Sequence, residues 1–285
     1  MPARRPPTTL VVLARLVLAI FGYLAVLTAV YALALLANAA LLGLGLAHAL
    51  ALGAVLVVWR IIDRRPLGAI GLARHQAIQR WLRGARTGAL MMGAIVLVWF
   101  TLIIGATWTT NPDPTRATLA VVIGFVGFLI QGPAEEVLFR GYVLENVRIR
   151  WGTTWAVAIS AVLFSVLHAS NPAFGFLPAL NLTLFGIAMA LYKLRWDQGQ
   201  LWGVFAIHTV WNWLQQMVFG LPNSGTTSSL DDVLFSVRPT TSLPDPLWGG
   251  GFGPEGTLGA TFVLAVLIWA TLRRPGTATS PRLPR

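Results

Sequence analysis

The segment Pro133-Ala134-Glu135-Glu136-Val137-Leu138-Phe139-Arg140-Gly141 places two acids and an arginine inside an apolar stretch of the chain. Two similar segments follow, Phe164-Ser165-Val166-Leu167-His168 and His208-Thr209-Val210-Trp211-Asn212. A charged acid at the centre of a membrane helix costs about 2.5–3.5 kcal/mol on insertion scales, so such residues mark functional sites by default. We therefore expect the acids and histidines of three successive helices to converge on one site.

The composition is typical of a membrane protein. Of the 285 residues, 56% are hydrophobic and only 11% are charged, whereas soluble domains carry about 25% charged residues. The mean hydropathy is +0.70, and apolar runs of about 20 residues alternate with short polar breaks, as in helices that cross a bilayer. We expect a multi-pass protein of the cell (inner or plasma) membrane, with the lipid bilayer as its main partner.

The predicted fold is all-α: a polytopic transmembrane helical bundle of about eight spans, in one integral membrane domain over residues 1–285. The first apolar run is too long for a cleaved signal peptide and is interpreted as a retained helix. The predicted spans cover residues 9–35, 41–62, 87–104, 118 to about 150, 153–169, 176–194, 201–219 and 257–272. Residues 118–220 contain all three motifs and form the predicted catalytic core.

Three segments lie outside these spans. Residues 63–86 are rich in arginine with apolar residues between, so they are expected on the cytoplasmic side, able to lie along the membrane surface as an amphipathic helix. Residues 221–256 are rich in Gly, Pro, Ser and Thr and form a predicted outer loop, in which Asp231-Asp232 is interpreted as a solvated turn. Residues 273–285 are predicted to be a disordered tail.

The basic residues predict the orientation of the chain. With both termini in the cytoplasm, all 21 basic residues except Arg116 and Arg238 fall on the inner side, as the positive-inside rule requires. The net charge of +11 therefore reflects topology, and we expect no nucleic acid partner. The chain has no cysteine, which excludes disulfides, thiolate metal ligands and a cysteine nucleophile.

The first motif separates the roles of its two acids. Glu136 and Arg140 are four residues apart, so they share one helix face and can form an ion pair. Glu135 points about 100° away around the helix and lacks that partner, which suits proton transfer. Pro133 precedes the acids and is expected to kink the helix and free a backbone carbonyl. The alternative is that both acids only neutralise arginines at a cytoplasmic helix end.

The histidines differ in how strongly each one indicates a functional site. His168 is a single histidine near a helix end, and such residues often only pack and form hydrogen bonds. His208 and Asn212 lie four apart on an otherwise apolar helix, where imidazole can bind metal or move a proton and an amide can stabilise an oxyanion. His48 is interpreted as structural, and His75 lies in the basic segment.

Signatures of other intramembrane proteases are missing from the sequence. It contains no His-Glu-x-x-His and no Gly-x-Ser-x-Gly, and no aspartate lies in a predicted span. The remaining side chains suit a glutamate-activated water assisted by histidine.

Taken together, Glu-Glu-x-x-x-Arg-Gly, Phe-x-x-x-His and His-x-x-x-Asn, in this order on successive helices, resemble the CPBP family of intramembrane metalloproteases. This family includes the type II CAAX prenyl endopeptidases and the bacteriocin-processing and lysostaphin-resistance-like proteins. The resemblance extends from about Pro133 to Asn212, roughly the middle third of the chain, and Leu201-Trp202 before His208 also fits it.

The resemblance implies an eight-helix endopeptidase whose site is reached from the cytosol. Glu135 and His168 would activate the attacking water, and His208 and Asn212 would stabilise the oxyanion. Glu136 and Arg140 would hold their helix in place.

A divalent metal, with zinc the first choice, is also implied by the resemblance. Its ligands would be Glu135, His168 and His208, which would leave one coordination position for water. This assignment competes with the oxyanion role of His208. The substrate would be a peptide or membrane-anchored protein, such as a bacteriocin leader, a regulator or a surface-protein precursor, and it need not be prenylated.

The depths of the histidines conflict with a simple bundle. At about 1.5 Å per residue, His168 lies about 21 Å beyond Thr154, whereas His208 lies about 10 Å beyond Leu201. Either the helix of His168 is tilted and starts below the membrane plane, or the site is not compact.

Two alternative functions remain open on the sequence. One is a non-catalytic immunity or binding protein on the same scaffold, which would tolerate inactivating changes at Glu135. The other is a proton-coupled transporter, since Glu and His inside helices also form proton relays. Such transporters often contain internal repeats, and none is evident here.

Overall fold

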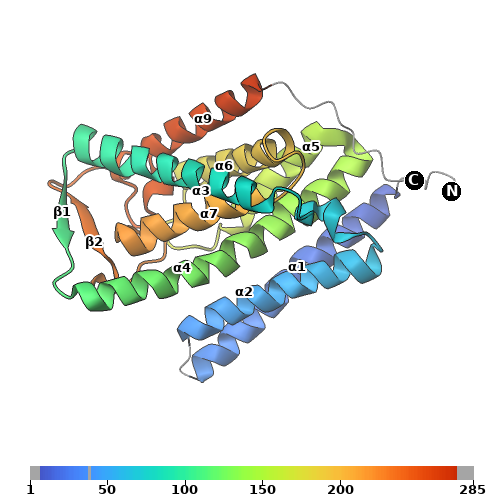
Figure 1. Ribbon diagram of the computed structural model, residues 1–285, viewed down its shortest axis with the longest axis horizontal. Helices are drawn as coiled ribbons and strands as arrows, with labels where there is room; N and C mark the ends of the chain where they lie inside the picture. Colours follow the sequence, from blue (N-terminus) through green and yellow to red (C-terminus); the bar gives the residue numbers. More distant parts are fainter. Residues whose placement is uncertain (1–6, 38–39, 275–285) are drawn as a thin grey trace.

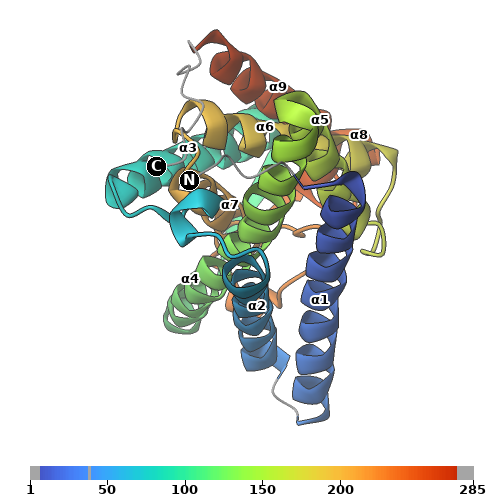
Figure 2. The ribbon, with the colours of Figure 1, turned by 90° about the vertical axis from the view of Figure 1, so that its right-hand side faces the viewer.

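The computed structural model describes residues 7–37 and 40–274, the side chains of 40–43 excepted. It begins with an α-hairpin of α1 (Thr9–Leu36) and α2 (Ala40–Val57), which is extended by the short π-helix η1 (Val58–Ile62). In Figures 1 and 2, α2 lies between α4 and most of α1, and α1 also contacts the central helices directly. The N-terminal hairpin is thus a side layer packed on the central helices.

The second half of the basic segment belongs to the helix that contains the predicted span 87–104. After η2 (Gly68–Leu72), helix α3 (Ala77–Gly93) continues without a break into η3 (Ala94–Ile103). The expected span 87–104 therefore begins ten residues earlier, at Ala77. The segment 63–86 is not one separate surface helix, because the second half of it packs against α7 (Trp202–Trp213).

Glycines explain why α3 packs on α7. A Cβ on Gly84 would overlap the carbonyl of Gly203, and one on Gly88 would lie 2.8 Å from the Ile207 carbonyl oxygen. Gly84 and Gly88 lie four apart on one helix face, the small-residue pattern that lets two membrane helices approach closely. The second half of the segment is therefore part of the helix bundle, and its position relative to the membrane surface stays a prediction.

The central unit of the fold is one long helical run that turns back on itself. Helix α4 (Pro114–Glu136) continues through the π-helix η4 (Val137–Val143) into α5 (Leu144–Leu167). The helix continues through Pro133, and the wider π pattern starts four residues later, at Val137. The chain leaves helical geometry at Gly152 (φ +82°, ψ 177°), where glycine adopts the left-handed φ at little cost. The predicted boundary before residue 153 is confirmed.

The remaining helices complete the bundle. Helix α6 (Phe176–Arg195) packs on α5, and α7 is followed by η5 (Leu214–Val218). The last long helix, α9 (Leu258–Arg273), packs on α6. Of the predicted tail 273–285, Arg273 ends α9 and residues from 275 onwards lie outside the described part of the chain.

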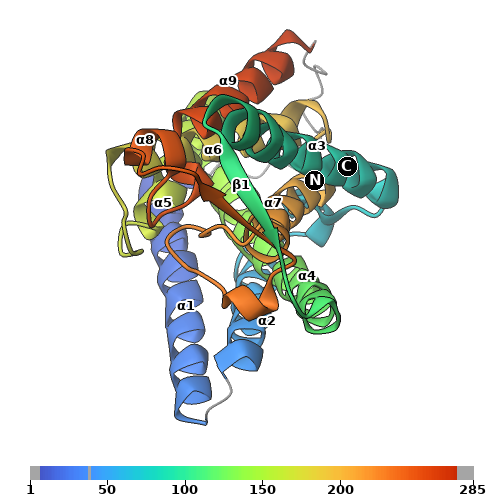
Figure 3. The same ribbon diagram turned by 90° about the vertical axis from the view of Figure 1, so that its left-hand side faces the viewer.

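One end of the bundle carries a β-ribbon, so the fold is mostly rather than purely helical. Strands β1 (Ala106–Thr110) and β2 (Phe235–Pro239) pair antiparallel, with Trp108 opposite Val237. The aromatic and β-branched residues of Ala106–Thr110 favour a strand. Figure 3 shows β1 crossing this end of the molecule. Three short helices lie in the predicted outer loop or at its end, namely η6 (Leu230–Asp232), α8 (Asp245–Trp248) and η7 (Pro254–Gly256).

Five of the described helices are long and apolar enough to cross a membrane, namely Thr9–Leu36, Leu44–Ile62, Gly68–Ile103, Pro114–Leu167 and Phe176–Arg195. The fourth contains two of the predicted spans, because it changes direction at Gly152. Helices α7 and α9 are shorter than a typical span of about 20 residues, so the predicted count of eight and the orientation stay predictions.

Candidate active site

Glu136 and Arg140 form a fully buried ion pair, as their spacing predicts. The Arg140 Nη1 donates to Glu136 Oε1 at 3.0 Å, and both side chains are inaccessible to solvent. The Arg140 guanidinium also lies 4.3 Å from the centre of the Phe164 ring, which stabilises its charge by a cation–π contact. Glu136 is thereby fixed at the junction of α4 and η4.

His208 binds the same glutamate from α7. Its Nδ1 lies 2.9 Å from Glu136 Oε1, and because a carboxylate only accepts, Nδ1 carries the proton. The ring therefore directs Nε2 away from Glu136 and towards Glu135, whose Oε2 is 3.8 Å away. Glu135, Glu136 and His208 are thus assembled from two helices, as the motifs predict.

Glu135 is held less tightly than its neighbour. It is 9% exposed and has no arginine partner. Its Oε1 accepts a hydrogen bond from Gln131 Nε2 at 3.1 Å, whereas its Oε2 has no hydrogen-bond partner in the described residues. Imidazole nitrogens of His208 and His48 lie 3.8 and 3.9 Å from it, just beyond hydrogen-bonding distance.

His168 ends α5 on the other side of the turn at Gly152. At about 1.5 Å per residue, Glu135 lies about 25 Å before Gly152 and His168 about 24 Å after it, so a helical hairpin brings them to one level. The rings of His168 and His208 both lie beside the Phe164 ring, with centroids 4.7 and 6.1 Å from it, so the site is compact. The Nδ1 of His168 donates to the Phe164 carbonyl at 2.8 Å, which leaves Nε2 as an acceptor. Among the described residues, His168 makes no ion pair with Glu135.

Asn212 lies one turn after His208 on the same face of α7. It is 5% exposed, and within residues 7–37 and 40–274 its amide has no assigned hydrogen bond. The amide is therefore able to donate to a group bound beside His208.

His48, interpreted from the sequence as a structural histidine, lies beside this cluster. It is 5% exposed, and its Nδ1 donates to the Leu44 carbonyl at 2.9 Å, so Nε2 faces Glu135 Oε1 as an acceptor. Tyr23 of α1 is also buried near Glu135, and its hydroxyl has no partner among the described residues. The signal for His48 was its position in an apolar span, but no motif spacing connects α2 to α4.

The three expected zinc ligands do not form a ligand set. In the described part of the chain, no group of three or more His, Cys, Asp or Glu side chains is placed to hold one ion. Of the expected trio, only Glu135 and His208 are within 4 Å of each other. The donor types suit zinc, but their arrangement does not fit it. The metal requirement stays a prediction.

Side chains from neighbouring helices donate hydrogen bonds to backbone carbonyls of the π-helix η4 and so fix the walls of the site. Widening of the helix at η4 leaves carbonyls without their usual partners. Ser160 Oγ donates to the Phe139 carbonyl at 2.9 Å, and Lys193 Nζ donates to that of Arg140 at 2.8 Å. These contacts tie α5 and α6 to the turn that carries Glu136 and Arg140.

Helix α7 is held from two sides at His208. The Ile207 carbonyl lies against Gly88 of α3, and the Thr209 amide lies against Gly132 of α4. The Thr209 hydroxyl also donates to the Phe128 carbonyl at 3.1 Å. The residues on either side of His208 are therefore locked, which fixes the distance from its ring to Glu135.

A further buried acid, from a segment far along the chain, lies in the neighbourhood of His168. Glu255, in η7, accepts hydrogen bonds from the Ser224 amide and from Gln215 Nε2, both at 2.9 Å. Burial raises the pKa of Glu255, and His168 acts on it through space in the opposite direction. The sequence did not indicate this residue, because it follows a loop whose fold brings it inward.

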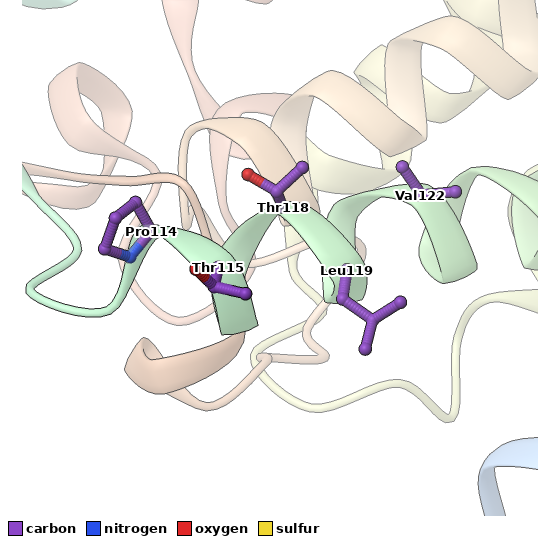
Figure 4. A pocket seen from close by; sticks show the side chains of 5 residues that line it. All are labelled: Pro114, Thr115, Thr118, Leu119 and Val122. Carbon is purple, nitrogen blue, oxygen red and sulfur yellow. The ribbon is translucent and has the colours of Figure 1, made fainter.

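The N-terminal end of α4 has a shallow depression that is separate from these residues. Pro114, Thr115, Thr118, Leu119 and Val122 line it (Figure 4). Val122 lies about 20 Å along the helix from Glu135. The depression is therefore not the candidate active site.

Comparison with known proteins assigns the motif-bearing segment to a family. Residues 116–214 match the family model described as Type II CAAX prenyl endopeptidase Rce1-like. The match covers the helices that carry Glu135, Glu136, Arg140, His168, His208 and Asn212. No curated protein and no solved structure gives a match. Residues 116–214 are therefore a domain of the Rce1-like type II CAAX prenyl endopeptidase family.

Proposed function

We propose that this protein is an intramembrane endopeptidase in which Glu135 removes a proton from the water that attacks a peptide bond. The observation that supports this most is the state of Glu135. It is a buried carboxylate with imidazole nitrogens 3.8 and 3.9 Å away and, among the described residues, no arginine or lysine partner. A carboxylate free of a tight partner can take a proton from water, whereas one in a short ion pair cannot do so readily.

Water activation is assigned to Glu135 and His168. Both have an acceptor available, Oε2 of the glutamate and Nε2 of the imidazole. A water between them would be oriented by two acceptors, one of which takes its proton as the oxygen attacks the carbonyl carbon. Such general-base assistance contributes typically 10²–10⁴-fold to a rate.

Oxyanion stabilisation is assigned to His208 and Asn212. The Asn212 amide can donate to the oxygen that gains charge when the carbonyl carbon becomes tetrahedral. His208 donates from Nε2 once it is protonated, and Glu136 at its Nδ1 stabilises that cation. One such donor is worth about 2.7–4 kcal/mol in known enzymes.

Glu136 and Arg140 are assigned a positioning role. Their buried pair fixes the junction of α4 and η4, and Glu136 orients the ring of His208. Removal of one member would leave the other as an uncompensated buried charge. Neither is needed to touch the substrate.

The proposed substrate class is supported by the family match and by the apolar exterior of the bundle. A peptide or a membrane-anchored protein would present its scissile bond near the cytoplasmic face of the membrane. Apolar side chains face outwards from the bundle, among them Leu102, Leu119 and Phe262 at 76%, 61% and 69% exposure. Contact of these side chains with lipid would keep the bundle in the bilayer, where an anchored substrate can diffuse to it.

The test uses the detergent-purified protein and a fluorogenic peptide library, with wild type, Glu135→Gln and the control Asp231→Asn. Asp231 is an exposed acid in the ion-pair cluster around Arg116, so its change to an amide leaves the site intact. We expect cleavage by wild type and the control, and a loss of about 10²–10⁴-fold in Glu135→Gln. Equal cleavage by Glu135→Gln would contradict the mechanism, and the same assay with a chelator tests the predicted metal requirement.

A further inference from the structure

One side of α3 packs on the bundle, and the opposite side is exposed. Gly84 and Gly88 lie against α7, and at about 100° per residue Arg86 lies on roughly the other side of the helix. Large apolar side chains share this exposed side, namely Ile78, Leu82 and Leu90 at 73%, 58% and 67% exposure. Basic and apolar side chains thus form one surface on a helix that is long and apolar enough to cross a membrane.

A shallow depression lies on this surface where two arginines meet an apolar side chain. It is lined by Gln79, Leu82, Arg83 and Arg86, which are three or four residues apart and so share one helix face. The planar guanidinium of arginine binds a phosphate group through two parallel hydrogen bonds. The depression therefore combines donors for a phosphate with an apolar wall.

The two arginines of the depression differ in how far their charge is compensated. Arg83 Nη1 donates to the Trp196 carbonyl at 3.2 Å and lies 3.7 Å from Asp197 Oδ1. Arg86 is exposed, and it forms no ion pair with any of the ten acids of the chain, all of which lie in the described residues. The depression thus has a net positive charge, which complements an anion.

Helices α6 and α9 bring further arginines close to the depression. The ring of Trp196, whose carbonyl Arg83 binds, lies 3.4 Å below the guanidinium of Arg274. Arg195 donates to the Arg274 carbonyl at 3.1 Å and so holds the end of α9 beside α6. The acid that faces this group is Asp197, which is already paired with Arg83. The positive charge therefore extends over three helices.

We propose that the depression binds the headgroup phosphate of an anionic phospholipid, with Arg86 as its main donor. The acyl chains would follow the exposed apolar side chains further along the same helix, Leu90 and Leu97, at 67% and 54% exposure. An acidic soluble partner would have no use for this apolar strip, whereas a lipid needs both parts. The inference goes beyond peptide cleavage and involves none of the residues assigned to it.

The test measures the thermal unfolding midpoint of the detergent-purified protein by tryptophan fluorescence while a phospholipid is added. The probes are dioleoyl phosphatidylglycerol, which is anionic, and dioleoyl phosphatidylcholine, which has a phosphate but no net charge. A ligand that binds the folded state raises its stability with concentration. We expect the midpoint of wild type to rise at lower concentrations of phosphatidylglycerol than of phosphatidylcholine.

Substitutions of Arg86 test whether the depression is the binding site. We expect Arg86→Gln to need about five-fold more phosphatidylglycerol for the same rise, the change that corresponds to about 1 kcal/mol for one arginine at an anionic surface. Arg86→Glu should need about 25-fold more, because it changes the charge by two. Arg86→Lys keeps the charge and should stay within about two-fold of wild type.

Arg64→Gln is the matched control, because Arg64 is an exposed arginine before η2 that does not line the depression. It should respond to phosphatidylglycerol as wild type does. A wild-type response of Arg86→Glu, or an equal loss in Arg64→Gln, would overturn the site. Glycerol phosphate, which lacks acyl chains, should not raise the midpoint at the same concentrations, and an equal rise would overturn the lipid as the ligand. The assay contains no peptide, so its result is independent of the proposed peptidase activity.

Discussion

Two buried acids on the same helical run, Glu135 and Glu145, have opposite surroundings. Glu145 receives Lys193 Nζ at 2.7 Å and Arg148 Nη2 at 2.7 Å, so both of its oxygens are paired. Glu135 also faces two basic side chains, yet their nitrogens stay 3.8 and 3.9 Å away. The difference of about 1 Å separates a carboxylate that holds helices together from one that remains able to react.

The different distances at Glu145 and Glu135 are explained by the basic side chains that face each acid. Lysine and arginine have long side chains that can close on an acid, and Lys193 does so from α6 while it also caps the Arg140 carbonyl. The histidines around Glu135 cannot follow, because each ring is fixed through Nδ1 to another acceptor, the Leu44 carbonyl for His48 and Glu136 for His208. The two imidazole rings are therefore held just beyond hydrogen-bonding distance of the Glu135 carboxylate.

The largest effect on stability is expected in the cluster of Glu145, Lys193 and Arg148. Lys193→Met leaves Glu145 with Arg148 alone and leaves the Arg140 carbonyl uncapped, so we predict a loss of about 3–5 kcal/mol of unfolding free energy. The matched control is Arg195→Met, since Arg195 lies two residues on and makes only exposed hydrogen bonds. Denaturant unfolding followed by the fluorescence of the 12 tryptophans measures both. A loss no greater than that of the control would show that the contacts of Lys193 with Glu145 and the Arg140 carbonyl do not stabilise the protein in solution.

A third buried acid, Asp197 in the turn after α6, sharpens the comparison through pH. Burial raises the pKa of Asp197 to about 6 from an ordinary 3.8, against the hydrogen bond from the Gly203 amide and the charges of Arg80 and Arg83. The folded state therefore holds the proton of Asp197 more tightly than the unfolded state does. The resulting contribution to the free energy of unfolding is complete below about pH 4 and is lost as the pH rises through about 6. We predict that wild type is less stable at pH 8 than at pH 4 by up to about 3 kcal/mol from this group.

The control for Asp197 is Asp197→Asn, which can still accept from the Gly203 amide but has no proton to lose. Its stability should lack this fall between pH 4 and pH 8, measured by the same tryptophan fluorescence. The same slope in both proteins would assign the pH dependence to other groups.

The distance between His208 and Glu135 depends on how closely α7 packs against α3. The substitution Gly84→Ala tests this dependence. An added Cβ at Gly84 overlaps the Gly203 carbonyl, so the helices must separate, at a cost of about 1–3 kcal/mol. Gly93→Ala is the matched control on the same helix, because a Cβ there meets nothing within 4 Å. We expect Gly84→Ala to lower cleavage as well as the unfolding midpoint, and Gly93→Ala to lower neither. Equal behaviour of the two variants would contradict the close packing.

The smallest effect is expected for an ion-pair cluster in solvent. Arg116 lies 2.9 Å from Asp232 and 3.7 Å from Asp231, and all three side chains are exposed. Exposed pairs contribute about 0–1 kcal/mol, so Arg116→Ala should shift the unfolding free energy by less than about 1 kcal/mol and leave cleavage unchanged. A larger shift would mean that short distances alone, without burial, make a cluster structural.

The sequence predicted what depends on local spacing. The pair of Glu136 and Arg140 follows from a separation of four residues, and the boundary at Gly152 from the break between two apolar runs. The resemblance to the endopeptidase family also rested on spacing, and the match over residues 116–214 confirms it.

Features that depend on contacts between distant segments were not predicted. His48 and Glu255 reach the site only because α2 and η7 fold against the core, and no regular spacing connects them to the motifs. The start of α3 at Ala77 was missed because the Gly84 and Gly88 face is recognisable only with α7 beside it. The β-ribbon was missed because β1 and β2 are short and lie far apart in the chain.

The most direct test of the central claim measures cleavage and unfolding free energy together for Glu135→Gln and Glu145→Gln. The account predicts that Glu135→Gln loses about 10²–10⁴-fold in cleavage at nearly unchanged stability. It predicts that Glu145→Gln loses about 3 kcal/mol or more of stability, while its folded fraction still cleaves. Loss of stability in Glu135→Gln with retained cleavage, or loss of cleavage in a stable Glu145→Gln, would contradict the assignment of the two acids.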